Sequence, residues 1–193
     1  MIFKLLKKKK EVKKESNLTT RLLLLTISTL LLFFSFTSNT SASTESTAII
    51  RENCALKSIP TANCYTSLSA WEAGEQRDLT ATDEIAVARI EGTWTNPDTT
   101  PVTIDGWTTD ATRYIRIYTT PEARHTGKWD NTRYRLESGN FGAKIVNNQQ
   151  DYTRIEGLQI HHSGGGGSSA GISSILFAGV IVKDSIVKKS STI

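Results

Sequence analysis

The chain has few of the side chains that bind metals or act as nucleophiles. Its 193 residues include two cysteines, three histidines and one methionine. Cys54 and Cys64 are separated by nine residues, with no histidine near them. Because a structural zinc ion needs four ligands, this pair excludes a zinc site of the ordinary kind.

Basic residues are scarce outside the N-terminus. Residues 1–42 hold eight of the 23 Lys and Arg residues and two of the 19 Asp and Glu residues, which leaves 15 basic and 17 acidic residues in the rest. A protein that binds nucleic acid needs a basic folded face, so this distribution argues against nucleic acid as a partner. With 38% hydrophobic residues, the chain is too apolar to be disordered, and its length suits one ordinary domain.

The first 42 residues have the order of a secretory signal peptide. A positively charged segment up to Arg21 precedes the apolar run 22–36, and small hydroxyl-bearing residues follow. The run is short for a bilayer, which needs roughly 20 helical residues. We therefore expect cleavage after Ala42 and a protein that is secreted or displayed at the cell surface. The alternative is an uncleaved anchor, the only route to a membrane that the sequence offers.

The two cysteines lie close behind this segment. An exported protein meets oxidising conditions in which thiols pair, so the sequence predicts a disulfide between Cys54 and Cys64. We expect residues 43–63, with Cys54, to form a linker, and residues 64–193 to form the folded part.

Short strands follow one expected helix. Ser69 and Glu72 have the spacing of a capping box, which predicts a helix that begins at Ser69 and runs to about Leu79. The alternation over 85–90 predicts a strand that is buried on both faces. No amphipathic helix separates the later apolar segments, which argues against βαβ units and predicts an all-β fold. The later strands are expected at 102–104, 114–118, 134–136, 144–146, 153–162 and 180–189, with stops at turn residues.

An internal repeat indicates how the strands are arranged. A shift of 27 residues aligns Ile155 with Val182 and Ile160 with Val187, and a weaker echo at an offset of 51 aligns Ile104 with Ile155. Repeats of this length, made of strands and tight turns, predict a solenoid in which each coil covers the inward side chains of the next. The alternative is coincidence between β-rich segments.

Three segments carry a resemblance to a known family. Residues 65–72 (YTSLSAWE), 102–107 (VTIDGW) and 152–160 (YTRIEGLQI) resemble the start of secreted bacterial right-handed parallel β-helix proteins of the pectate-lyase-like superfamily. The resemblance covers about residues 64–190 and implies a helix that caps the first coil. Family members include polysaccharide lyases, glycoside hydrolases, adhesins and surface proteins, so the fold alone does not settle function. Calcium is implied only by this resemblance, and no other cofactor is expected.

The C-terminal end of the sequence shows no cap. A solenoid needs a polar or helical cover at each end, and only four residues follow the strands at 180–189. We therefore expect the chain to be the N-terminal fragment of a longer β-helix protein.

Candidate ligand-binding residues lie on the strands at 153–162. If Ile160 points inward, alternation places Gln159 and His161 outward, and Arg154 joins them in an exposed polar row that could contact a sugar chain. The neighbouring His162 points to the opposite face from His161, so the two cannot share one ion. Surface decoration of the solenoid is the alternative interpretation of this row.

Other motifs offer no catalytic residue. The acids Asp151, Glu156 and Asp184 do not recur at matched positions, so neither a calcium cluster nor a glycosidase pair can be named. The glycine-rich stretch 164–171 has no following helix and no Lys-Ser/Thr, which favours a loop over a nucleotide site. Tryptophans beside turns could stack on sugars, but we expect packing instead; they are Trp94, Trp107 and Trp129.

Two function classes follow from these observations. We favour an extracellular or cell-surface β-helix protein that binds polysaccharide or another surface without catalysis. The alternative is the N-terminal part of a carbohydrate-active enzyme, either a pectate-lyase-like polysaccharide lyase or a glycoside hydrolase.

Overall fold

A computed structural model describes residues 42–55, 63–140, 142–164 and 169–190. The chain divides into two units between residues 42 and 43, and the description below concerns the second unit. The predicted signal peptide, apart from Ala42, lies outside the described residues. No helix within the described ranges is long and apolar enough to cross a membrane.

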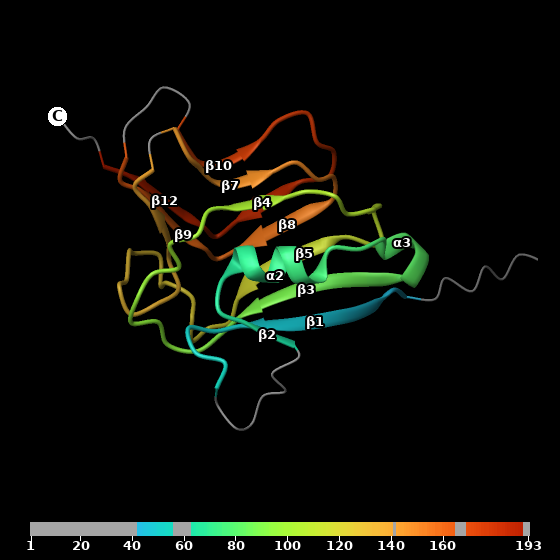
Figure 1. Ribbon diagram of the computed structural model, residues 1–193, viewed down its shortest axis with the longest axis horizontal. Helices are drawn as coiled ribbons and strands as arrows, with labels where there is room; N and C mark the ends of the chain where they lie inside the picture. Colours follow the sequence, from blue (N-terminus) through green and yellow to red (C-terminus); the bar gives the residue numbers. More distant parts are fainter. Residues whose placement is uncertain (1–41, 56–62, 141, 165–168, 191–193) are drawn as a thin grey trace, which may run out of the picture. The chain divides into compact units, whose positions relative to one another are not determined.

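The described chain is mostly β structure, in three sheets whose strand pairings are all parallel (Figure 1). Sheet 1 has, in spatial order, β2 (Cys64–Tyr65), β1 (Thr44–Ile50), β3 (Glu84–Ile90), β5 (Ile115–Thr119), β8 (Thr153–Glu156) and β11 (Ile181–Lys183). Sheet 2 has β6 (Leu136–Ser138), β9 (Gln159–His162) and β12 (Ile186–Lys189), and sheet 3 has β4 (Val102–Ile104), β7 (Lys144–Asn148) and β10 (Ala170–Ser174).

The chain visits the sheets in a repeating order. From β5 onward it passes through sheets 1, 2 and 3, repeats this passage from β8 to β10, and begins it again with β11 and β12. Between β3 and β4, a single parallel bridge from Asp98 to Leu136 takes the place of the sheet 2 strand. This arrangement is consistent with a β-helix-like fold, and the prediction of an all-β parallel architecture is confirmed at this level.

The register agrees with the 27-residue repeat. Val182 pairs with Ile155 in sheet 1, and Val187 pairs with Ile160 in sheet 2. The weaker echo at an offset of 51 is wrong, because Ile104 belongs to sheet 3 whereas Ile155 belongs to sheet 1. Similar short sequences therefore occupy different sides of the structure.

Inward side chains stack in columns that form one hydrophobic core. Ala88, Ile117 and Ile155 follow one another across sheet 1 and are fully buried. Trp94 and Trp107 are buried as well, so their predicted packing role is confirmed. Trp94 meets Tyr134 edge to face at 4.8 Å between ring centroids, and Trp107 stacks on Trp71 at 5.5 Å. Close packing of these rings fills the space that the short strands enclose.

Two strands form where the sequence analysis expected loops. Residues 44–50, assigned to a linker, form β1, which pairs with β3 along its whole length. Ala170 and Gly171, assigned to the glycine-rich loop, begin β10; residues 165–168 of that loop lie outside the described residues. In both cases pairing with a neighbouring strand outweighs a weak local pattern.

The expected helix is shorter and begins earlier. Helix α2 (Leu68–Glu75) has Ser67 as its N-cap, whose hydroxyl accepts a hydrogen bond from the Ala70 amide at 3.0 Å. Glu72 does not close a capping box: its carboxylate instead accepts bonds from the Asp105 amide and the Trp107 indole. A second short helix, α3 (Leu79–Thr82), begins after Asp78. The family resemblance implied that the helix covers the first coil. In sheet 1, however, β1 pairs with the edge of β3, so strands and not the helix extend the sheet beyond β3.

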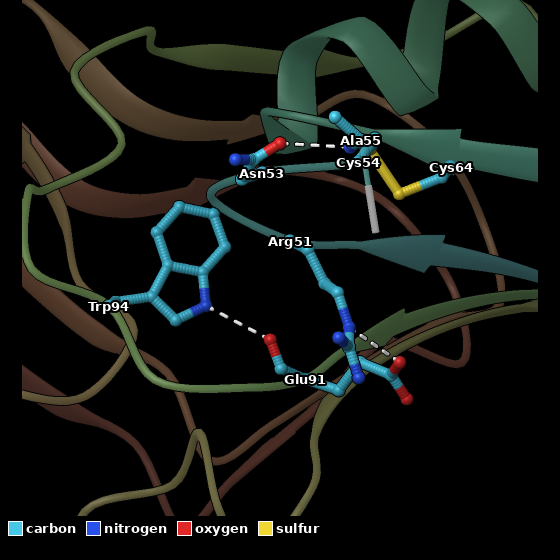
Figure 2. Close-up of a disulfide and its surroundings, with 7 residues drawn as sticks. All are labelled: Arg51, Asn53, Cys54, Ala55, Cys64, Glu91 and Trp94. Atoms are coloured by element: carbon cyan, nitrogen blue, oxygen red, sulfur yellow. Dashed lines mark hydrogen bonds and ion pairs between the residues drawn. A yellow bond between two sulfur atoms is a disulfide. The ribbon is translucent and has the colours of Figure 1, made fainter. Parts of the chain in front are cut away.

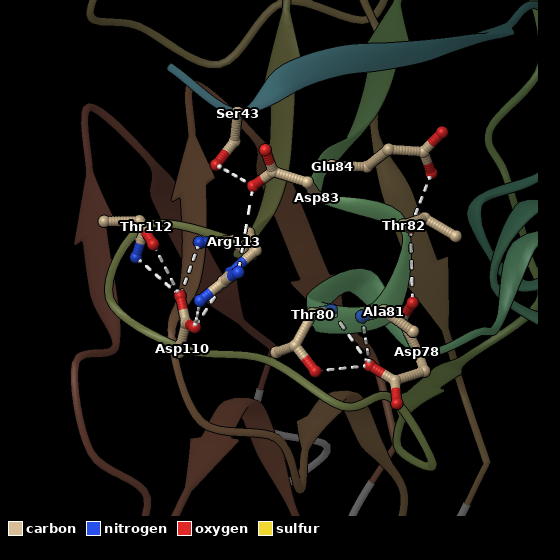
Figure 3. A network of polar contacts seen from close by, with 10 residues as sticks. All are labelled: Ser43, Asp78, Thr80, Ala81, Thr82, Asp83, Glu84, Asp110, Thr112 and Arg113. Carbon is tan, nitrogen blue, oxygen red and sulfur yellow. Dashed lines mark hydrogen bonds and ion pairs between the residues drawn. The ribbon is translucent and has the colours of Figure 1, made fainter. Parts of the chain in front are cut away.

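A polar network fastens the turns at the amino ends of β1, β3 and β5 (Figure 3). Arg113 bonds to Asp110 and lies 3.8 Å from Asp83, which also accepts a bond from the Ser43 hydroxyl. The Arg113 guanidinium is the main reason why the pKa of Asp110 lies well below its usual range. Asp78 caps α3 with bonds from the Thr80 and Ala81 amides. These contacts hold the starts of three adjacent strands together.

A buried carboxylate joins α2 to the core. Asp98 is 4% exposed and accepts hydrogen bonds from the Leu68 amide at 2.8 Å, the Tyr134 hydroxyl at 3.1 Å and the Thr100 amide at 3.1 Å. Burial raises the pKa of Asp98, and burial together with the neighbouring carboxylate raises the pKa of Tyr134 well above 10. The network thus favours a neutral Tyr134.

Tyr134→Phe should lower the free energy of unfolding by about 1.5–3 kcal/mol at pH 7, because a bond to a buried charged group is lost. Since the folded-state pKa of Tyr134 is raised, its contribution is complete below pH 10 and is lost as the pH rises above 10. The difference between wild type and variant in urea unfolding should therefore shrink at alkaline pH. Tyr118→Phe, at a half-exposed position, should change stability by less than about 0.5 kcal/mol; equal effects of both changes would contradict the assignment.

Cys54 and Cys64, the predicted pair, form a disulfide with a Cα–Cα distance of 5.8 Å (Figure 2). Cys64 opens β2 and pairs with Ile49 of β1. The bond therefore ties the segment that leaves β1 to the strand that lies beside β1. Nearby, Arg51 bonds to Glu91 at 2.7 Å, and the Trp94 indole donates to the Glu91 carbonyl.

Replacing both cysteines with serine should lower the free energy of unfolding by about 2–3 kcal/mol, because the short loop gains freedom in the unfolded chain. Urea unfolding with and without reductant measures this. Reductant should destabilise the wild type by the same amount and leave the double variant unchanged. A wild type insensitive to reductant would refute the structural contribution.

Candidate functional site

The outer face of sheet 1 carries a row of cationic and aromatic side chains. Arg116 of β5 pairs in register with Arg154 of β8, and Tyr118 pairs with Glu156, which in turn pairs with Lys183 of β11. Alternation along each strand directs these side chains away from the core. We call these five residues, together with Tyr114, the sheet 1 outer face.

Tyrosine rings support the two arginines. The Arg154 guanidinium lies 3.5 Å from the centroid of the Tyr114 ring, and that of Arg116 lies 4.5 Å from the Tyr118 ring. A guanidinium stacked on a ring keeps its charge and its in-plane N–H donors. The arginines are thus pre-oriented to bind an anionic group.

Glu156 and Glu45 are the acids that contact this face, and Glu156 is the more buried of the two. Although it points outward, it is only 8% exposed, and its carboxylate lies 3.7 Å from Arg116 and 3.4 Å from Lys183. Arg116 also lies 3.7 Å from the Glu45 carboxylate of β1. Three cations, Arg116, Arg154 and Lys183, thus face two carboxylates, and the row keeps a net positive charge of one. The face therefore favours anions over cations.

A pocket of about 460 Å³ borders the face, where the chain leaves β5. Its wall is held in place by a bond from the Arg124 guanidinium to Thr119 and by a contact between His125 and the Asp184 carbonyl. Gly157 has a φ of +77°, and a Cβ there would lie 2.3 Å from the Arg124 Nε, so only glycine fits. The pocket is lined by Arg116, Tyr118, Thr119, Pro121, Arg124, His125, Thr126 and Glu156.

The described lining of the pocket lacks the carboxylate pair of a glycosidase. Among its described lining residues Glu156 is the single acid, whereas glycosidases use two carboxylates on either side of the bond that they cleave. Within the described part of the chain, no group of three or more His, Cys, Asp or Glu side chains could hold a metal ion. The arginines and the tyrosine supply donors and an apolar surface for a ligand.

A larger pocket, of about 770 Å³, is lined in part by Arg51, Asn53 and Glu91. Figure 2 shows these three residues near the disulfide. Two of its charged side chains are paired with each other, since Glu91 binds Arg51 at 2.7 Å, and Glu91 also binds Arg89 at 3.0 Å. Glu52 accepts bonds from the Thr95 and Asn96 amides, and chiefly the Thr95 bond lowers the pKa of Glu52. These bonds join neighbouring turns, so we assign the pocket a structural role.

The three candidate residues from the sequence do not form one row. Arg154 lies on the sheet 1 outer face, whereas Gln159 and His161 belong to β9 of sheet 2. His161 is half-buried and bonds to the Ser190 hydroxyl, with its ring edge against Trp129. The structure thus separates Arg154 from the other two.

The expected exposure of Gln159 is wrong. Its side chain points outward from sheet 2, but the loop that follows β5 covers it completely. Its amide accepts a bond from the Asp130 amide at 2.6 Å and donates to the carbonyls of Asp130 and Tyr134. Gln159 therefore anchors this loop and is not available to a ligand.

Sequence reasoning missed Arg116 and the wall of the pocket. The alternation Ile115-Arg116-Ile117-Tyr118 was a signal for an outward arginine and tyrosine. No sequence signal showed that Arg116 would lie beside Arg154, because 37 residues separate them.

Comparisons of the chain with protein-family models, with curated proteins and with solved structures give no match.

Gln159→Leu should lower the free energy of unfolding by about 2–3 kcal/mol, because it leaves buried backbone groups of the loop without partners. Gln149→Leu makes the same chemical change at an exposed position and should cost less than about 0.5 kcal/mol. Urea unfolding gives both values, and hydrogen exchange should rise over residues 123–134 in the first variant alone. Equal stability of the two variants would contradict the anchoring role.

Proposed function

We propose that this protein is a right-handed parallel β-helix related to the pectate-lyase-like superfamily, and that it binds an anionic polysaccharide on its sheet 1 outer face without cleaving it. The observation that carries the proposal is the in-register pair Arg116 and Arg154, each supported by a tyrosine ring. Guanidinium groups bind carboxylates and sulfates through two parallel hydrogen bonds, which suits a chain of acidic sugars.

The spacing of the strands supports a polymeric ligand. Parallel neighbours lie about 4.8 Å apart, so Arg116 and Arg154 present charge at successive steps along the sheet. The tyrosine rings add an apolar surface of the kind that sugar rings contact. A linear anionic glycan that crosses the strands would meet both arginines and the pocket beside them.

An extracellular location agrees with this ligand. Disulfides persist in oxidising compartments, and Cys54 and Cys64 form such a bond. We propose secretion or display at the cell surface, where polysaccharides are available as ligands. Binding is preferred to the carbohydrate-active enzyme because the described pocket supplies one carboxylate and not two.

Arg116→Ala and Arg154→Ala should each weaken binding of polygalacturonate about tenfold, which corresponds to about 1.4 kcal/mol. Arg113→Ala is the matched control: its side chain is 31% exposed, against 32% for Arg116, and it is not part of the sheet 1 outer face. Calorimetry on the full chain measures each affinity. Because all variants keep the same basic N-terminus, its contribution to binding is equal in each. Raising the salt concentration should weaken wild-type binding, and neutral dextran should bind at least tenfold more weakly than the acidic polymer.

Equal affinity of the three arginine variants would place any binding elsewhere. Equal affinity for dextran and polygalacturonate would refute the anionic ligand.

A further inference from the structure

The two arginines of the sheet 1 outer face differ in their charged neighbours. Arg154 stacks on the Tyr114 ring, and no carboxylate among the described residues lies within 4.0 Å of its guanidinium nitrogens. Arg116 lies 3.7 Å from the Glu45 carboxylate and 3.7 Å from the Glu156 carboxylate. The face therefore combines an arginine without an internal counter-ion and an arginine that lies between two acids.

Arg116 contacts both acids through charge alone. Its nitrogens lie 3.7 Å from the carboxylate oxygens, whereas charge-assisted hydrogen bonds between such groups are about 2.7–2.9 Å long. An anionic ligand group that comes within hydrogen-bond distance would thus form a stronger contact with Arg116 than either internal carboxylate does.

Each acid has another favourable environment when it leaves Arg116. The side chain of Glu45 is 53% exposed, so water can solvate its carboxylate. Glu156 is largely buried, but its carboxylate also lies 3.4 Å from Lys183 and keeps that partner. Displacing the two acids from Arg116 leaves no buried charge unpaired, which keeps the free-energy cost of the exchange small.

This difference orders the two contacts that an anionic ligand makes. A single acidic group binds Arg154 without displacing an internal carboxylate, so Arg154 is favoured over Arg116 as the first contact. Arg116 lies one strand away, at about 4.8 Å. A polymer held at Arg154 presents its next acidic group there at a high effective concentration, which favours replacement of the internal acids.

We propose that Glu45 and Glu156 determine which arginine an anionic ligand contacts first. An isolated sugar acid binds at Arg154 alone, whereas an acidic polymer binds at Arg154 and then replaces the two carboxylates at Arg116. This inference rests on the proposed binding of an anionic polysaccharide and adds the order of its contacts.

Nuclear magnetic resonance of the full chain, titrated with galacturonate, tests which arginine an isolated sugar acid contacts. The arginine Nε–H signals, assigned with Arg116→Ala and Arg154→Ala, report on each side chain separately. Galacturonate should shift the Arg154 signal and leave the Arg116 signal nearly unchanged. In the variant that combines Glu45→Gln with Glu156→Gln, it should shift both signals.

A double-mutant cycle measures the competition for Arg116. With Arg116 present, Glu45→Gln with Glu156→Gln should tighten binding of polygalacturonate about fivefold at pH 7, at the upper end of what partly exposed ion pairs contribute. In the Arg116→Ala background, the same two changes should lose this gain. Calorimetry gives all four affinities. Glu45→Gln alone, at an exposed position, should change the affinity in the same direction if the combined variant is unstable.

Glu122→Gln with Glu137→Gln is the matched control for net charge. Glu137 pairs with Arg135 on sheet 2, and Glu122 is an exposed residue of the loop after β5. The gain in affinity from these two changes measures the general electrostatic contribution, which should be smaller and should persist in the Arg116→Ala background.

Equal shifts of the two arginine signals in the wild type would overturn the inference, as would a fivefold gain that persists without Arg116. In either case polymer binding would still depend on both arginines, and the proposed function would stand. Polymer binding that neither Arg116→Ala nor Arg154→Ala weakens would refute the proposed function and this inference together.

Discussion

The constraint on which the rest of the structure depends is the in-register stacking of parallel strands. When Ile155 lies directly between Ile117 and Val182, each inward side chain is buried by its neighbours above and below. This stacking excludes water from the interior without long helices or long strands. It also accounts for the exposure of Val182, since only one side of that residue is covered within the described chain.

The same stacking builds the candidate site. A strand that directs Ile115 and Ile117 inward must direct Arg116 and Tyr118 outward, and the pairing then brings Arg116 to Arg154. Rigid strands hold the charged groups, while the loop after β5 supplies one wall of the pocket. Because the strands pair in register, the two arginines lie one strand apart in the same row, between Val87 and Ile181.

Buried polar groups set the positions of the parts that do not stack. Asp98 joins the start of α2 to Tyr134, and Gln159 joins sheet 2 to the loop after β5. Each group has its hydrogen bonds satisfied inside the protein, so displacing either segment would leave a buried polar atom without a partner. Helix and loop are thereby fixed in one position against the sheets.

The sequence by itself determined the class of fold, most strand positions, the register between Ile155 and Val182 and the pairing of Cys54 with Cys64, because these follow from local alternation, a short repeat and chain proximity. Only the tertiary structure decided that residues 44–50 form a strand, that Gln159 is buried and that Arg116 meets Arg154. These depend on pairing between distant segments and on which loop covers which face. Local patterns report which way a side chain points from its own strand, but not what lies on top of it.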